Sequence, residues 1–232
     1  MGKSKELAEL GNVVTQSGGN VGIGVSNPSA PLEITANSGA NALRIRARSG
    51  DDYGFINYYS NDGSTRWAEI YSSSDKDINF TTDGTGSVKF KVDASGRVTM
   101  PYQPAFSAYY SGFGNFTYNA GNIVAEFNAT RFNIGNHFNT STGVFTAPVS
   151  GVYAFYFNGY NNSTSYARWL LLKNGSDAFG GQGAISQSGD AICVSGAVYL
   201  NASDFVRIEA VYNGQLLYQQ SEHTTFSGYL IG

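Results

Sequence analysis

The sequence predicts an all-β protein built of two structural units, and three features carry this prediction. Of the 232 residues only 13% are charged, whereas 14% are aromatic and 29 are glycines. From about residue 20 onward, apolar residues alternate as they do in strands, and glycine-containing polar turns separate the runs. Residues 1–100 hold 21 of the 31 charges, but residues 101–232 hold 25 of the 33 aromatic residues. This shift places the boundary between the two units near Met100 and Pro101.

Composition also excludes several classes of protein. No stretch approaches the 18 or more apolar residues of a membrane-spanning helix, and residues 1–20 show no apolar core of a secretory signal. Cys193 is the only cysteine, which excludes an internal disulfide framework and a cysteine-based zinc site. The net charge is −3 without a basic block, so nucleic-acid binding is not expected.

Residues 1–20 are expected to form an attachment segment with a short helix over 3–14. Leu7, Leu10 and Val14 fall on one face of that helix. A helix of this length is unstable alone in water. A frayed terminus or expression scar therefore remains open beside a short coiled-coil or docking segment.

Residues 21–100 are expected to form a β-rich fibre shaft. Their short strands are predicted at 53–59, 65–71, 77–80, 88–92 and 97–100. Their apolar faces are narrow, so one such segment cannot bury enough surface to fold alone. Several chains wound together can do so, and an intertwined fibre is predicted.

Within the shaft, the segment VGIG at 21–24 precedes Pro28 and LEI at 32–34. This arrangement resembles an element common in bacteriophage tail-fibre and tail-spike proteins, where it often precedes a fibre domain. As plain structure, the two glycines mark a strand at which backbones approach closely. The resemblance implies a virion fibre that is synthesised in the host cytoplasm.

Residues 101–232 carry longer strand patterns, which indicate a β-sandwich or jelly roll. The strands are predicted at 151–157, 168–175, 191–200, 204–211 and 211–218, with Asn-Gly hairpin turns at 174–175 and 213–214. In the first of them, Tyr153, Phe155 and Phe157 alternate with Val152, Ala154 and Tyr156. Both faces are apolar, so both are expected to be covered.

A second resemblance covers about residues 101–232. An ordered set of residues stands at spacings similar to those of the globular head of complement C1q, namely Phe127, Asn133, Phe138, Phe145, Gly151, Tyr153, Phe155 and Phe157. The closing segment TTFSGYLIG (224–232), with Phe226 and Gly228, resembles the last strand of that family. PAFSA (104–108) resembles its first strand.

The C1q resemblance implies a ten-stranded jelly roll, related to tumour necrosis factor, that assembles as a homotrimer. It implies a non-enzymatic recognition head in which the signature residues are core scaffold. Animal members carry a collagen stalk, whereas this chain has no Gly-x-y repeat. A phage fibre tip is therefore favoured over a complement, adipokine or synaptic role.

Two stretches of the head, 109–119 and 159–166, combine aromatic and amide side chains that suit sugar recognition. The receptor-binding candidates are Tyr109, Phe113, Tyr118, Tyr160, Asn161 and Asn162. The alternative, that these aromatic side chains plug the interface between subunits, remains open.

Catalytic residues and cofactors are not expected. His137 and His223 are the only histidines, and no nucleophile-elbow pattern surrounds any serine, so both are predicted to be structural. Some relatives hold calcium at the trimer apex, which makes Asp177, Asp190 and Asp204 the metal candidates if threefold symmetry supplies further oxygens.

The sequence thus predicts a homotrimeric phage tail-fibre protein whose head adsorbs to a bacterial surface receptor, with a glycan favoured over a protein. Its N-terminus is expected to bind other tail or baseplate proteins, and no nucleic acid or membrane insertion is expected. The alternatives are a structural virion fibre or decoration protein and, less favoured, a glycan depolymerase.

Overall fold

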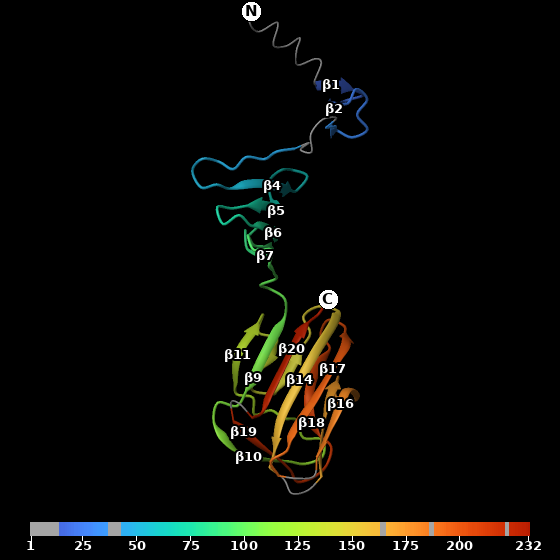
Figure 1. Ribbon diagram of the computed structural model, residues 1–232. Helices are drawn as coiled ribbons and strands as arrows, with labels where there is room; N and C mark the ends of the chain where they lie inside the picture. The colour runs from blue at the N-terminus through green and yellow to red at the C-terminus, as the bar shows by residue number, and fades with distance from the viewer. Residues whose placement is uncertain (1–13, 37–42, 163–165, 186–187, 221–222) are drawn as a thin grey trace, which may run out of the picture. The chain divides into compact units, whose positions relative to one another are not determined.

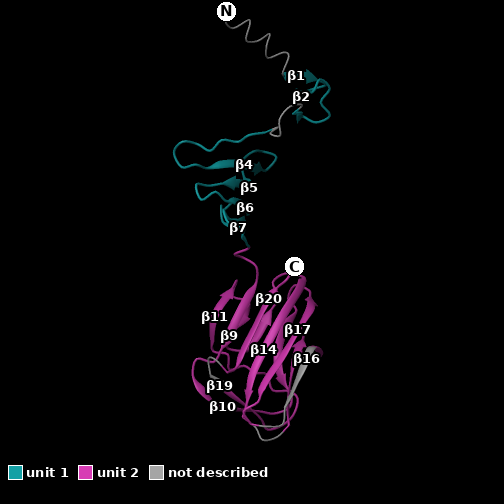
Figure 2. Cartoon of the chain, viewed as in Figure 1, with its two compact units in different colours: residues 1–99 teal, residues 100–232 magenta. Residues whose placement is uncertain are grey.

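The structure, a computed structural model, describes residues 14–36, 43–162, 166–185, 188–220 and 223–232 (Figure 1). Within these ranges every regular element is a β-strand, which confirms the all-β prediction. The same ranges contain no helix long and apolar enough to cross a membrane. Contacts divide the chain into two compact units, residues 1–99 and 100–232 (Figure 2). The division lies one residue before the boundary that the composition predicts.

A three-stranded sheet opens the described part of unit 1. It consists of β1 (Val14–Ser17), β2 (Asn20–Ile23) and β3 (Leu32–Ile34), with β1 antiparallel and β3 parallel to β2. The helix predicted for 3–14 is wrong at Val14, whose β-branched side chain suits the strand pair that it forms with Ile23. Residues 3–13 lie outside the described ranges.

The glycines of the 21–24 motif allow close backbone approach, as expected. A Cβ added at Gly22 would lie 2.3 Å from the carbonyl oxygen of Val25. At Gly24, which also has a positive φ of 73°, it would lie 2.3 Å from the carbonyl oxygen of Thr35. Larger residues at either position would push the strands apart.

A five-stranded antiparallel meander follows in unit 1. Its strands pair in chain order as β4 (Gly54–Tyr59), β5 (Arg66–Ser72), β6 (Ile78–Thr82), β7 (Val88–Val92) and β8 (Val98–Thr99). Each predicted strand of this region is confirmed to within two residues. The accuracy reflects the polar turns: glycine supplies the positive φ after β4, β6 and β7, and Lys76 adopts it in the turn after β5.

Unit 2 is a sandwich of two sheets. The seven-stranded sheet has the order β10-β19-β14-β20-β9-β11, with β17 on the other side of β14. Its strands are β9 (Ala105–Tyr109), β10 (Phe113–Tyr118), β11 (Ala129–Ile134), β14 (Gly151–Asn161), β17 (Ala191–Leu200), β19 (Gln215–Gln220) and β20 (Thr225–Leu230). The five-stranded sheet orders β12 (Phe138–Asn139), β13 (Val144–Thr146), β18 (Phe205–Ala210), β15 (Ala167–Lys173) and β16 (Asp177–Ile185).

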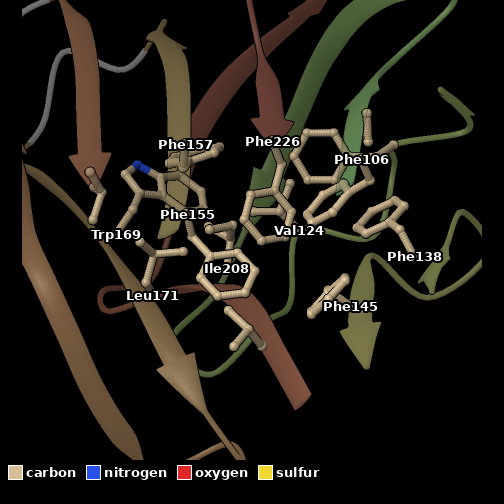
Figure 3. Close-up of a cluster of buried hydrophobic side chains, with 14 of the residues drawn as sticks. Phe106, Val124, Phe138, Phe145, Phe155, Phe157, Trp169, Leu171, Ile208 and Phe226 are labelled. Carbon is tan, nitrogen blue, oxygen red and sulfur yellow. The ribbon is translucent and has the colours of Figure 1, made fainter. Parts of the chain in front are cut away.

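One aromatic core fills the space between these two sheets (Figure 3). Phe106 stacks on Phe138 with ring centroids 4.6 Å apart and meets Phe226 edge to face at 5.0 Å. Trp169 lies in the same cluster and meets Tyr118 edge to face at 5.1 Å. Buried rings of this size remove about 150–250 Å² each from water, so they dominate the stability of the unit.

Two expectations about unit 2 need correction. The Asn-Gly turn at 174–175 joins the hairpin β15–β16, as predicted, but the turn at 213–214 connects β18 to β19 in the other sheet. Turn residues specify a bend, whereas the partner of the next strand depends on packing. The described unit also has twelve strands in place of ten, because bends around Gly135 and Gly143 divide residues 129–146 into three short strands.

The two ends of unit 2 differ. The chain enters at Pro104, whose carbonyl accepts a hydrogen bond from the Leu230 amide, and the C-terminus lies at this same end (Figure 1). Strand β14 begins there, where the Val152 amide donates to the Gly232 carbonyl. It ends at Asn161, at the opposite end of the sheet, beside the start of β17.

Candidate functional site

The signature residues of the head lie in its core. Seven aromatic members are buried between the sheets: Phe127, Phe138, Phe145, Tyr153, Phe155, Phe157 and Phe226. Asn133 holds the turn after β11, since its Nδ2 donates to the Phe138 carbonyl and its Oδ1 accepts from the Phe138 amide. These side chains build the scaffold and leave ligand contact to other residues.

Gly151 and Gly228 are also buried, and both permit close packing. A Cβ at Gly151 would lie 2.7 Å from Leu230 Cδ1 and 3.0 Å from the Gly232 carbonyl oxygen, which is the clash expected at this strand entry. A Cβ at Gly228 would lie 2.4 Å from the ring of Phe155. Both glycines therefore let the C-terminal strand pack against β14.

The outward face of β14, β17 and β20 is uncharged, and we call it the tyrosine face. Its residues are Val152, Ala154, Tyr156, Asn158, Cys193, Ser195, Ala197, Tyr199, Thr225, Ser227 and Tyr229. At its centre the rings of Tyr156 and Tyr229 stack at 6.1 Å, and their hydroxyls lie 3.3 Å apart. That hydrogen bond raises the pKa of Tyr156. Both tyrosines are exposed in a single chain, so this face is a candidate self-association surface.

The structure separates the six receptor-binding candidates. Tyr118 is buried in the core with its hydroxyl donating to Glu126, and Asn161 is also buried. Their burial removes both from any exposed binding surface. Both residues are predicted as binding residues because stretches rich in Tyr and Asn look alike in the sequence, whether they line loops or end strands.

The remaining four candidates are accessible but do not form one group. Phe113 is 79% exposed at the start of β10. Tyr109 ends β9 and lies under the guanidinium of Arg131, 4.7 Å from its ring centroid, in a cation–π contact. Tyr160 and Asn162 are half-buried, and both line the same pocket.

That pocket has a volume of about 200 Å³ and is lined by Tyr160, Asn162, Tyr218 and His223. The imidazole of His223 stacks on the Tyr160 ring, with centroids 5.1 Å apart and an interplanar angle of 27°. Tyr218 completes the cluster, 6.0 Å from Tyr160 and 5.5 Å from His223. Three flat rings and one amide thus surround a small space, and none of these four side chains is a carboxylate, a lysine or an arginine. We call it the aromatic pocket.

Hydrogen bonds with two other segments of the chain hold the amide of this pocket. Asn162 Nδ2 donates to Asn115 Oδ1 at 2.6 Å, and Ser188 Oγ donates to Asn162 Oδ1 at 3.0 Å. The bond to Asn115 joins the two stretches, 109–119 and 159–166, that the sequence singles out. At the backbone, Thr224 Oγ1 donates to the Tyr218 carbonyl, which holds the segment carrying His223. The Asn162 amide of the pocket is therefore oriented before a ligand arrives.

Sequence reasoning misses two of the four pocket residues. Tyr218 alternates with the buried Leu217 on β19, and this alternation is the one signal that turns it outward. His223 is predicted to be a structural histidine, but it is exposed and stacks at the pocket. The position of His223 beside Tyr160 of β14 depends on tertiary packing, for which the sequence carries no local signal.

The three metal candidates do not meet. Asp204 accepts hydrogen bonds from Asn174 Nδ2 and the Asn201 amide and pairs with Lys173, which together lower its pKa to about 2. Its carboxylate thus serves a turn. Asp190 lies at the opposite end of unit 2 from Asp204, and Asp177 is exposed at the start of β16. Among the described residues no three His, Cys, Asp or Glu side chains gather as metal ligands, so this arrangement does not fit a calcium site within one chain.

Comparisons with known proteins agree with this architecture. The family model of the C1q domain matches residues 105–231, which is more than half of the chain. Similar solved structures include the globular domain of zebrafish complement 1qA, which is 24% identical with a TM-score of 0.43 over 56% of this chain and 98% of that one. Another is the Eiger tumour necrosis factor of S. frugiperda, 14% identical with a TM-score of 0.42 over 56% of this chain and 94% of that one.

Murine APRIL is also similar, with 8% identity and a TM-score of 0.44 over 56% of this chain and 99% of that one. No match was found among the curated proteins. The family model, the signature residues in the core and the two-sheet topology lead to one conclusion. The chain belongs to the C1q domain family.

Proposed function

We propose that the chain is a homotrimeric phage tail-fibre protein whose head adsorbs to a bacterial surface glycan through the aromatic pocket. C1q-type domains are non-enzymatic binding modules that often form homotrimers. The virion context rests on the resemblance of the VGIG segment at 21–24 to an element of phage tail-fibre proteins. The observation that carries the proposal is the cluster of three rings and a fixed amide at one end of the head.

The chemistry of the pocket suits a neutral sugar. The C–H faces of sugar rings lie on aromatic side chains, and sugar hydroxyls bond to amides such as that of Asn162. A volume of about 200 Å³ is below the roughly 300–1,000 Å³ of pockets that enclose drug-sized ligands. A single sugar ring or the end of a glycan chain is therefore the expected ligand.

Three copies of a weak site make firm attachment feasible. Once one pocket of a rigid trimer holds a polysaccharide, the next contacts are effectively intramolecular, and avidity rises by about 10²–10⁴. The pocket lies at the end of the head opposite Pro104, where the chain enters. Tail or baseplate proteins are the proposed partners of the N-terminal segment, and the virion is the proposed location.

A panel of bacterial surface polysaccharides tests the proposal. We expect the purified trimer to bind at least one neutral glycan and to compete with phage for adsorption to the host. His223→Ala and Tyr160→Ala should weaken binding at least tenfold, since each removes a stacking surface worth about 1.4 kcal/mol or more in a trivalent complex. Tyr212→Ala is the matched control, because Tyr212 is an exposed tyrosine of the same head outside the pocket.

The same variants distinguish receptor binding from the structural alternative. If Tyr160→Ala dissociates the trimer, the cluster belongs to the subunit interface, and a structural fibre or decoration protein is favoured. If both variants stay trimeric and bind as well as the control, the pocket is not the receptor site. Asn161 is unsuitable for this test because it is buried, and Asp62 is a poor shaft control because its carboxylate orders the turn at 60–64.

A further inference from the structure

A short segment before β4 alternates apolar side chains with arginines. Residues 43–48 read LRIRAR, and Arg44, Arg46 and Arg48 form what we call the arginine row. The segment runs back along β4 (Figure 1), and its turn is closed by the Arg48 amide, which donates to the Tyr53 carbonyl, and by the Asp52 amide, which donates to the Arg48 carbonyl. Three of the 14 lysine and arginine residues of the chain therefore lie close together in the sequence.

The apolar and the charged side chains of this segment lie on opposite sides. Ile45 and Ala47 line a hollow of about 260 Å³ over one face of the meander. Phe55 projects from the other face, since both of its neighbours on β4 line the hollow. The guanidinium of Arg48 lies 5.8 Å from the centroid of the Phe55 ring. Alternate residues of an extended segment share a side, so the other two members of the arginine row lie on the side of Arg48.

A cluster of three rings lies on the same face as the arginine row. Phe55 is directly opposite Tyr71 in the strand register, with ring centroids 5.1 Å apart. Tyr53 stacks on Phe55 at 5.6 Å with an interplanar angle of 9°. All three side chains are half-buried, so part of each remains accessible. The arginine row and these three rings together are called the arginine–ring surface.

Two members of the arginine row have no counter-charge. Arg48 forms a two-point ion pair with Asp51, with Nε 2.6 Å from Oδ1 and Nη2 2.5 Å from Oδ2. Arg44 and Arg46, in contrast, are exposed, and neither side chain forms a hydrogen bond or ion pair with another residue that the structure describes. The buried carboxylates of the adjacent sheet are already paired with a lysine or arginine of their own. An acidic chain thus presents uncompensated positive charge beside a group of rings.

We propose that the arginine–ring surface binds an acidic polysaccharide, a glycan chain that carries carboxylate or phosphate groups. The planar guanidinium fork matches both of these groups, and aromatic rings take the C–H faces of sugars. Alternate residues of an extended segment lie about 6.5 Å apart, so the row offers repeated contacts to a linear polymer, whereas a small anion meets one arginine. The site is separate from the aromatic pocket of the head, and a bacterial surface as the source of the polymer rests on the proposed function.

Other occupants use less of this surface. Identical arginine rows repel one another, so a second copy of the chain does not fit here. Proteins that bind nucleic acids are typically basic, whereas this chain has a pI of about 5.3. An acidic peptide pairs with the arginines but brings no sugar ring to the aromatic cluster. An acidic glycan uses both halves of the surface.

Four polymers test the proposal on the purified full chain at low ionic strength. Polygalacturonate carries sugar rings and carboxylates, its methyl ester carries the sugar without the charge, and poly-L-glutamate carries the charge without the sugar. We expect polygalacturonate to bind at least tenfold more tightly than either, and added salt to release it, since salt screens exposed charges. Equal binding of poly-L-glutamate would favour an acidic peptide and overturn the proposal. Tighter binding of oligothymidylate would overturn it in favour of a nucleic acid.

A double variant tests the two unpaired arginines. Arg44→Gln with Arg46→Gln should weaken polygalacturonate binding at least tenfold, because two charge-assisted contacts are lost in every copy. The matched control is Lys76→Gln with Arg97→Gln, which removes two exposed cations of unit 1 outside the row and changes the net charge equally. If the double variant binds the polymer as well as this control, binding follows net charge alone and the row is not a site.

The aromatic pocket of the head keeps this proposal distinguishable from the proposed function. Tyr160→Ala should leave polygalacturonate binding unchanged, and the double arginine variant should bind a neutral glycan as the parent does. If Tyr160→Ala abolishes polygalacturonate binding, the head holds the polymer and the arginine–ring surface does not. If polygalacturonate binds through the arginines and no neutral glycan binds, the function proposed for the head fails while this site stands.

Discussion

Tyr153 and Tyr156 lie three positions apart on β14 and have opposite surroundings. Tyr153 is fully buried, with its hydroxyl donating to the Val149 carbonyl at 2.8 Å, and burial raises the pKa of this phenol. Tyr156 faces outward on the uncharged tyrosine face. One side chain therefore contributes to the fold of a single head, and the other is available for contact between heads.

Replacing a core aromatic residue should cost most of the stability of the head. Tyr153→Ala or Phe155→Ala leaves a cavity between the sheets and is expected to lower the free energy of unfolding by about 3–5 kcal/mol. This loss is comparable with the whole margin of a domain, so assembly should fail as well. Chemical denaturation followed by aromatic fluorescence measures it. A variant that stays trimeric and equally heat-stable would show that these side chains are not core.

The Asp77 carboxylate makes the stability of unit 1 dependent on acid. Burial alone raises the pKa of Asp77, but hydrogen bonds from Lys91 and Ser73 outweigh it and lower the pKa to about 2, from an ordinary value of 3.8. The Asp77 carboxylate therefore binds a proton more tightly in the unfolded chain than in the folded chain. The stabilisation, about 2 kcal/mol at most, is fully present above pH 4 and is lost as the pH falls to about 2.

The difference between parent and variant isolates this carboxylate. Asp62, Asp83 and Asp204 also have pKa values lowered to about 2, so the parent loses stability at low pH for several reasons. Asp77→Asn should be less stable than the parent at pH 7, and this gap should narrow between pH 4 and pH 2. Denaturant unfolding at a series of pH values measures the gap, and a constant gap would contradict the assigned ion pair.

At the scale of the element, β14 contributes to the core, to the candidate self-association surface and to the pocket. Its inward residues Tyr153, Phe155 and Phe157 pack in the core, and its outward residues build the tyrosine face. Its far end carries Tyr160 into the aromatic pocket. Strand alternation thus directs core residues to one face of β14 and residues of the tyrosine face to the other. The pocket residue Tyr160 lies near the end of the strand.

A lysine on the tyrosine face should break assembly without unfolding the head. In a trimer that covers this face, Tyr156→Lys or Tyr229→Lys buries an unpaired ammonium group, which costs several kcal/mol. We expect these variants to be folded monomers by sedimentation velocity and circular dichroism. Tyr212→Lys should remain trimeric. Trimers of unchanged stability in the first two variants would place the interface elsewhere.

The strands, the core and the pocket also differ in how far the sequence predicts them. The strands β4–β8 follow from alternation and turn glycines, which are local signals. The signature residues from Phe127 to Phe157 identify the core because their spacing is long and specific. The pocket was half predictable: Tyr160 and Asn162 lie in a conspicuous stretch, but Tyr218 and His223 join them only through packing of β19 against β14. No local pattern encodes that contact.

At the scale of the whole molecule, each unit leaves a surface that one chain does not cover. In unit 1 this surface is made of exposed apolar side chains of the meander, such as Ile56, Trp67 and Ile78, and in unit 2 it is the tyrosine face. The narrow apolar faces of residues 21–100 already indicate the uncovered surface of unit 1, and the low charge of residues 101–232 indicates that of unit 2. Receptor binding through three weak pockets has the same requirement, because its avidity needs several copies. The homotrimer is therefore the central claim.

The mass of the purified full chain in solution tests that claim most directly. Light scattering coupled to size-exclusion chromatography at micromolar concentration should give three times the chain mass of 24.8 kDa. The value should persist on dilution, since the trimer buries the tyrosine face of every chain. A well-folded monomer of 24.8 kDa under the same conditions would contradict the account.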